Sequence, residues 1–381
     1  TLSMWLTAAQ VDVTQIGYLG AVWAPYALKF LWAPLLDRFS LPLFGRRRGW
    51  ILLAQLLLIV TLSTLGSCDP ATDLPWLALL ALATAFISAT QDIVIDAHRT
   101  DVCGVEQAVP GTAGYISGYR IALLLARTGA PLAVGLLLWP WAAVYQLLAL
   151  TIGLGLVGTL LAPEAAPQPA ATLRQTVIEP LRAFRRDHQP RQLLTIAIFI
   201  SLFRFGDFLV AQWNAVFLLH LGFTNTEVGW MNALGLGTGI IGAIGGSLLL
   251  QRLGRDRGLW LAAGLQAASN LGYLMLALSG KSWATMTAVV VIENLCGGLG
   301  TAAFLAFLLS LCSPAWSGTQ FALLSSLMQL LPIAVGAFTG AAVKHYGWPG
   351  FFAISVLAAA PSILLLPTFA PWTRSRPLES R

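Results

Sequence analysis

The sequence predicts an all-α polytopic membrane protein made of two related helical halves. Hydrophobic residues make up 57% of the 381 residues, charged residues only 10%, and the mean hydropathy is +0.75. Soluble domains carry about 25% charged residues, so this chain has too few charges to cover a water-facing surface. Many apolar stretches also approach the ~20 residues that cross a hydrocarbon core of roughly 30 Å.

The apolar stretches predict eleven membrane-spanning helices, each bounded by polar or charged residues. The expected spans are 16–35, 50–67, 75–96, 113–137, 141–161, 193–219, 228–250, 258–279, 283–311, 318–343 and 348–368. The first segment, TLSMWLTAAQ, is too short to span.

Two halves of the chain resemble each other. VTQIGYLGAV at 13–22 matches NTEVGWMNAL at 225–234, and each opens a helix after a polar loop. The repeat aligns Thr1 near Trp213, so we expect the first of six helices in the first half to be largely missing from this chain. Internal repeats are typical of secondary transporters, whose substrate site lies between the repeats.

The repeat and the composition together predict four segments. A Pro- and Ala-containing stretch forms the only long polar connection, which is typical of a linker. The expected segments are an N-terminal helical half at 1–162, a linker at 163–192, a C-terminal helical half at 193–370 and a tail at 371–381.

The positions of the basic residues predict an orientation. If the spans alternate across the membrane, sixteen basic residues fall on one side and only Lys281 and Lys344 on the other. The sixteen are Arg38, Arg46, Arg47, Arg48, Arg99, Arg174, Arg182, Arg185, Arg186, Arg191, Arg252, Arg255, Arg257, Arg374, Arg376 and Arg381. Cytoplasmic loops are rich in Lys and Arg, so the linker and the C-terminus are expected in the cytoplasm.

Several function classes fit poorly. The pI of about 9.4 comes from short clusters between apolar spans rather than from a face that could bind nucleic acid. The four cysteines lack metal-ligand spacing, and the four histidines lie at span ends or in loops. Single charges on different helices do not form the rings of a channel. We therefore expect a transporter that works as a monomer in the lipid bilayer, with no enzyme activity, cofactor or metal.

Ionisable residues crowd the end of the third predicted span, QDIVIDAHRTDV at 91–102. Asp92 and Asp96 are four residues apart and share one helical face. A charge within a bilayer is costly and tends to face the bundle interior and pair, so we expect Asp92 to pair with Lys29 or Arg120. Two interpretations remain open: a carboxyl that exchanges its basic partner for a proton, or a permanent ion-pair cluster.

The second half holds fewer buried charges. Arg204 and Asp207 are three apart, which favours an ion pair between them. Glu293 has no basic neighbour in sequence, so it is either a proton carrier or a neutral hydrogen-bonding group. The amides within the spans bind sugar hydroxyls or join helices. Trp5 and Trp213 are candidates for stacking on sugar.

The loop APLLDRFSLPLFGRRRGW resembles the signature between the second and third helices of the major facilitator superfamily. What the resemblance implies is a cytoplasmic latch, with Asp37 as the acid and Arg38, Arg46, Arg47 and Arg48 as its basic partners. The inserted SLPLF departs from the usual spacing. The alternative is that the arginines anchor the loop to anionic headgroups.

Six motifs in order resemble the AmpG-like muropeptide permeases of that superfamily: KFLWAPLLDRF, GRRRGW, SATQDIVIDAHRTDV, LQAASNLGY, ENLCGGLGTAAF and TQFALLS. The resemblance implies a fold of six plus six helices. It also implies proton-coupled import of GlcNAc-anhydroMurNAc peptides across the bacterial inner membrane, for cell-wall recycling and β-lactamase induction. Acetyl-CoA transporters share a similar QD…D helix, so another sugar or acyl conjugate is the alternative substrate. The family has a basic residue in its eleventh helix where this chain reads QLLPIAVG.

Together these interpretations give two sets of candidate residues. Those expected to act in proton coupling are Asp92, Asp96, Asp207 and Glu293. Those expected to contact the substrate are Lys29, Gln91, Arg120, Arg204, Gln212, Asn214, Gln266, Asn270 and Asn294.

Overall fold

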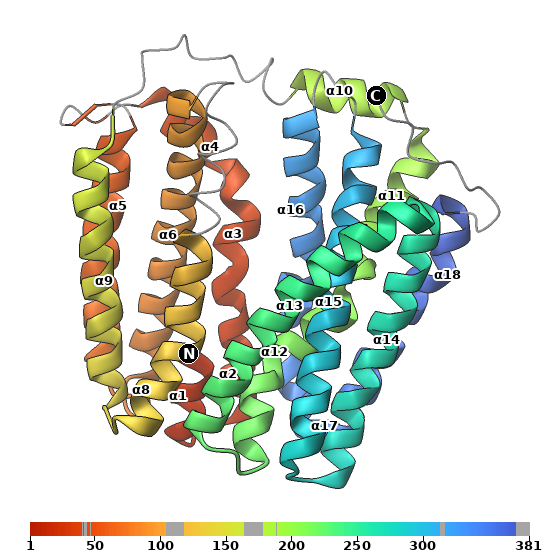
Figure 1. Ribbon diagram of the computed structural model, residues 1–381. Helices are drawn as coiled ribbons and strands as arrows, with labels where there is room; N and C mark the ends of the chain where they lie inside the picture. The colour runs from red at the N-terminus through yellow and green to blue at the C-terminus, as the bar shows by residue number, and fades with distance from the viewer. Residues whose placement is uncertain are drawn as a thin grey trace. The chain divides into compact units, whose positions relative to one another are not determined.

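The described residues of the computed structural model are 1–39, 41, 44–45, 47–103, 118–163, 178–187, 189–312 and 317–370. They are overwhelmingly helical, which confirms the all-α expectation (Figure 1). The chain divides into two compact units, residues 1–12 with 19–173 and residues 13–18 with 174–381.

The first unit contains three long helices and several short ones. In chain order its elements are α1 (Leu2–Ala8), η1 (Leu19–Trp23), α3 (Ala24–Leu28), η2 (Lys29–Leu31), α4 (Ala33–Arg38), α5 (Arg48–Gly66), α6 (Leu74–Cys103), the π-turn η3 (Leu125–Gly129), α8 (Ala130–Leu136) and α9 (Trp141–Leu161). Helix α5 packs against both α6 and α9. At one crossing the Cβ position of Gly66 lies only 2.6 Å from the Tyr145 Cβ, so a residue without a side chain is needed there.

The expected continuous span at 16–35 is wrong. The chain there is broken into five short helical pieces, of which α2 (Val13–Tyr18) belongs to the second unit. Pro25 and Pro34 stand in the first turns of α3 and α4. Proline has no N–H to donate and cannot continue a helix in its interior, so each proline begins a new segment.

The second unit holds the longest helices. They are α10 (Glu179–Asp187), α11 (Pro190–Phe203), α12 (Phe205–His220), α13 (Asn225–Leu253), α14 (Arg255–Ser279), α15 (Trp283–Leu311), α16 (Ser317–Gly336), α17 (Thr339–Leu357) and α18 (Ala360–Phe369). The expected span 193–219 is interrupted at Arg204, between α11 and α12. Gly347, with φ of 67°, breaks α17 where the sequence predicts a loop between the last two spans.

Eight segments of the described chain are long and apolar enough to cross a membrane. They are Arg48–Gly66, Leu74–Arg99, Trp141–Leu161, Pro190–His220, Asn225–Leu253, Arg255–Ser279, Trp283–Leu311 and Thr339–Phe369. The third predicted span, 75–96, is extended by α6 to Cys103, so the whole QDIVIDAHRTDV motif lies on one continuous helix.

Glycines bring α13 and α15 into backbone contact. The Cβ position of Gly242 lies 2.2 Å from the Leu295 carbonyl oxygen, and that of Gly298 lies 2.3 Å from the Gly239 carbonyl oxygen. Small residues allow such close approach between membrane helices, where dispersion contacts replace the hydrophobic effect as the attraction. The glycine-rich runs of the sequence are therefore required for packing at this crossing.

This contact predicts a difference between two glycines of the same helix. Gly242→Ala places a methyl group against the backbone of α15 and should cost about 1–3 kcal/mol through overpacking. Gly245→Ala, with open space around its Cβ position, should be neutral or slightly stabilising. Thermal unfolding of the two purified variants checks this, and equal melting temperatures would contradict the backbone contact.

Candidate functional site

In the first unit an ion pair joins Lys29 to Asp92. The Lys29 ammonium lies on the short helix η2 and the Asp92 carboxylate on α6, and each side chain is 31% exposed. The expected pairing is thus observed with Lys29. Because the pair is neither fully buried nor fully solvated, the carboxylate is in a setting where partner and solvent both affect its charge.

Neighbouring hydrogen bonds fix the short helices to α6. The Tyr26 hydroxyl and Ser88 Oγ lie 2.7 Å apart, and Trp32 Nε1 donates to Thr90 Oγ1 at 3.1 Å. These contacts bracket Lys29 on its own segment. The broken helix therefore aligns its lysine with Asp92 by side-chain bonds rather than by regular helix packing.

The two later carboxylates of the motif have other basic partners. Arg99 Nη2 lies 3.2 Å from Asp96 Oδ1 on the same helix, with the Asp96 side chain 43% exposed. Arg47 Nε lies 3.1 Å from Asp101 Oδ2, and both side chains are buried. Each of the three carboxylates thus has its own ion pair, and the Arg47–Asp101 pair ties α6 to the start of α5.

The arginine loop is also attached to α9. Arg48 Nε and Nη2 donate to the carbonyl oxygens of Thr159 and Leu160 at 3.1 and 2.6 Å, which satisfies orphan acceptors at the end of that helix. The expected latch partners Asp37 and Arg38 lie on α4, but their side chains, like Arg46, lie outside the described residues. The latch therefore stays a prediction.

Two further candidates of the first unit lie apart from an ion pair. Arg120 is exposed on the helical stretch 118–124, and Gln91 is half-buried on α6. The predicted partnership between Asp92 and Arg120 is not the one that forms. Trp5 is 7% exposed and packs 5.1 Å from the Tyr145 ring, so its expected role in sugar stacking is not supported.

In the second unit the helix break places Arg204 between two partners. Its Nε donates to Asp207 Oδ2 at 3.3 Å and its Nη1 to Thr301 Oγ1 at 2.6 Å. Asp207 is buried, whereas the Arg204 side chain is 28% exposed. The third nitrogen, Nη2, has no partner among the described residues and remains available as a donor.

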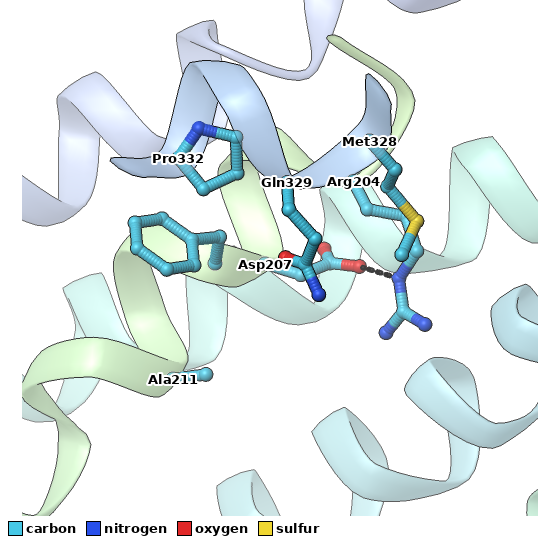
Figure 2. Close-up of a pocket in the computed structure, with 7 residues that line it drawn as sticks. Arg204, Asp207, Ala211, Met328, Gln329 and Pro332 are labelled. Carbon is cyan, nitrogen blue, oxygen red and sulfur yellow. Dashed lines mark hydrogen bonds and ion pairs between the residues drawn. The ribbon is translucent and has the colours of Figure 1, made fainter. Parts of the chain in front are cut away.

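A cavity of about 170 Å³ opens beside this pair. Figure 2 shows Arg204 and Asp207 joined on one wall and Met328, Gln329 and Pro332 on the facing helix α16. Phe208 and Ala211 of α12 complete the lining. Gln329 begins the QLLPIAVG stretch, so this lining holds a neutral amide where related permeases are expected to have a basic residue.

The amides near the end of α12 have internal partners. Gln212 Nε2 donates to the Gly336 carbonyl oxygen at 3.1 Å, and Asn214 Oδ1 accepts from the Ala215 N–H at 2.6 Å. Trp213 is 1% exposed and donates to Thr339 Oγ1 at 3.0 Å. These contacts join α12 to α16 and α17, so Trp213 is a core residue and not a free sugar platform.

The remaining amides lie on α14 and α15. Gln266 and Asn270 are buried on one face of α14. Asn294 Nδ2 donates to Glu293 Oε2 and to the Val290 carbonyl oxygen, each at 2.8 Å, and the same amide packs on Gly235 of α13. The structure thus brings the candidate residues of the second half together on α12, α14 and α15.

Some members of these clusters escaped the sequence analysis. Thr301 and Ser88 are ordinary helix residues whose role follows only from their partners. Gln329 was visible as a departure from the family pattern, but nothing in the sequence places it beside Asp207. Tyr273 sits seven residues after Gln266, a spacing that marks the same helical face and could have been noticed.

Comparison with known proteins agrees with this architecture. Residues 1–337 match the Major Facilitator Superfamily. The anhydromuropeptide permease of Escherichia coli (strain K12) is 42% identical over 377 residues, which are 96% of this chain and 74% of the permease. An uncharacterized protein of Haemophilus influenzae is 33% identical over 386 residues, covering 97% of this chain and 89% of that protein.

Two solved structures share the fold at low identity. The nucleoside transporter NupG has a TM-score of 0.75 at 14% identity, covering 99% of this chain and 94% of its own. A D-xylose–proton symporter has a TM-score of 0.65 at 13% identity, with 99% of both chains covered. These likenesses establish the fold alone. With most of its length matched to the family and 42% identity to the E. coli permease, the chain belongs to the Major Facilitator Superfamily, as an AmpG-like permease.

Proposed function

We propose that the chain imports anhydro-muropeptides, GlcNAc-anhydroMurNAc with or without a peptide, across the inner membrane by alternating access. The observation that carries this proposal is the 42% identity to an anhydromuropeptide permease along 96% of the chain. Import of these fragments would serve cell-wall recycling and supply the fragments linked to β-lactamase induction.

The driving force in this proposal is the proton gradient, and Asp92 is its first coupling site. The carboxylate and Lys29 form a half-buried ion pair. An ion pair favours the charged carboxyl, whereas burial without a partner favours the protonated one. A conformational change that separates Lys29 from Asp92 would therefore take up a proton, and re-forming the pair would release it.

Arg204 is the proposed contact for a substrate carboxylate. Its Nε and Nη1 are held by Asp207 and Thr301, and its Nη2 is left beside the cavity. A guanidinium already fixed by two partners loses little freedom when it binds a third group. Lys29 and the exposed Arg120 are the alternatives, with the buried amides as contacts for sugar hydroxyls.

The proposed organisation follows the expected segments. The helical halves 1–162 and 193–370 would be the two moving parts, joined by the 163–192 linker. The linker and the 371–381 tail would lie in the cytoplasm, where Arg46–Arg48 would act as a latch. A single chain supplies both partners of each ion pair, which supports a monomer as the working unit.

The orientation can be tested by cysteine accessibility. In a variant without the native cysteines, labels at Arg46→Cys and Ala170→Cys should react only from the cytoplasmic side, because basic loops stay inside. A cysteine at Lys281, on the opposite side, is the control and should react from the periplasm. Periplasmic labelling of either of the first two positions contradicts the proposed orientation.

The role of Arg204 can be tested with paired substrates. Arg204→Gln should weaken uptake of peptide-bearing muropeptide by about ten- to a hundredfold, the loss of a charge-assisted hydrogen bond of ~1.5–3 kcal/mol. The peptide-free disaccharide should be much less affected. Arg252→Gln, at the exposed end of α13, serves as the control. An equal loss for both substrates would assign Arg204 a structural role only.

Coupling can be tested in membrane vesicles with labelled muropeptide. Asp92→Asn should abolish accumulation driven by an imposed pH gradient while counterflow stays measurable, because Asn cannot carry a proton. Asp69→Asn, an exposed loop residue, should leave both processes unchanged. If Asp92→Asn still accumulates substrate under the gradient, another carboxyl couples transport; if uptake by the unmodified protein ignores the gradient, proton coupling itself is wrong.

A further inference from the structure

The charges inside the second unit do not balance. Within the described parts of α11 to α16, the ionisable acids and bases away from the helix ends are Arg204, Asp207 and Glu293. One guanidinium and two carboxylates leave one negative charge if all three are ionised. An uncompensated charge in a low-dielectric interior is strongly destabilising, so one positive charge is required.

The helices around Glu293 supply no such charge. Helix α13 has Glu227 and Arg252 near its ends, and Glu227 pairs with Lys281 outside the interior. The only charged side chains of α14 lie in its first turn, and α16 contains none. The groups whose charges act on Glu293 are Arg204 and Asp207, while Tyr273 and Cys296 lie nearby as neutral acids.

Unpartnered polar atoms point to the same place. Asn270 is 0% exposed, yet both its Oδ1 and its Nδ2 lack a hydrogen-bond partner among the described residues. The same holds for Gln266 Oε1 and for the Tyr273 hydroxyl. Buried polar atoms are rarely left unsatisfied, because each costs about 1–3 kcal/mol. Their occurrence together on one face of α14 indicates a missing ligand.

Contacts place this face between the two carboxylate-bearing helices. Gln266 Oε1 lies 3.4 Å from the Cβ position of Gly300 on α15, and Asn270 Nδ2 lies 3.1 Å from that of Gly206 on α12. Gly206 directly precedes Asp207 on α12, while Gly300 lies two turns beyond Glu293 on α15. The absence of side chains at these glycines leaves the amide atoms facing the interior.

We propose that this interior holds one exchangeable monovalent cation, either a proton or a sodium ion. Asp207 and Glu293 supply the negative charge, and the amide and phenol oxygens of α14 supply neutral contacts. Oxygen atoms are the ligands that hard cations bind, and the same atoms solvate a shared proton through water. The site is separate from the Lys29–Asp92 pair and does not depend on which substrate is transported.

Two measurements on the full chain reconstituted in lipid test this site without transport. Infrared spectra across a pH series in sodium-free buffer detect the carbonyl stretch of a protonated carboxyl group. Thermal unfolding at fixed pH and ionic strength, with choline exchanged for sodium, detects sodium binding, because a ligand of the folded state raises Tm. The variants are Glu293→Gln and Asp207→Asn. Glu227→Gln is the matched control, since Gln keeps the helix-capping contact of that residue.

For a proton, the protein shows a titrating carbonyl band that persists in sodium and in Glu227→Gln. Glu293→Gln or Asp207→Asn removes it. For a sodium ion, sodium raises the Tm of the unmodified protein and of Glu227→Gln, and this rise is lost in Glu293→Gln. The proposal is overturned if the unmodified protein shows neither signal, or if both carboxyl variants keep the signal. The unmodified protein alone decides the first case, so a variant that does not fold leaves the test intact.

Discussion

Charge neutrality within an apolar interior is the constraint on which the rest of this structure depends. Ionised side chains are costly in hydrocarbon, so those present must meet a counter-charge at close range. Asp92, Asp101 and Asp207 each do so, with Lys29, Arg47 and Arg204 as partners. A transporter can use this constraint, since a change in one pair must be matched by movement of a proton, an ion or a charged substrate.

The two units meet the constraint by different local structure. In the first, prolines break the chain into short helices, and side-chain hydrogen bonds then align Lys29 with Asp92 on α6. In the second, the break falls at Arg204 itself, which turns the guanidinium toward Asp207 and Thr301. A regular helix would bring neither basic group to its partner in this way. The irregular backbone therefore lies where charges must be positioned, and the glycine contact between α13 and α15 remains regular.

The sequence predicted the fold class because membrane helices follow from apolar run length, and pairing of Asp92 and Asp207 because buried charges seek opposite ones. It failed where the outcome depends on three-dimensional context. The span at 16–35 is apolar throughout, but Pro25 and Pro34 divide it. Trp213 has the composition of a sugar-binding residue, yet it is packed against Trp348 and Phe351. Thr301 gives no signal in sequence, because its importance comes from one hydrogen bond to Arg204.

The most direct test of the neutrality constraint is a double-mutant cycle on Lys29 and Asp92, measured as the thermal stability of the purified chain in lipid. Lys29→Gln and Asp92→Asn each leave one half-buried charge without its partner, whereas the double variant removes both charges. If charge balance governs this interior, the double variant is more stable than the sum of the single losses predicts, and at least as stable as the worse single variant. Additive losses would show that the two charges act independently, and would contradict the central role of their pairing.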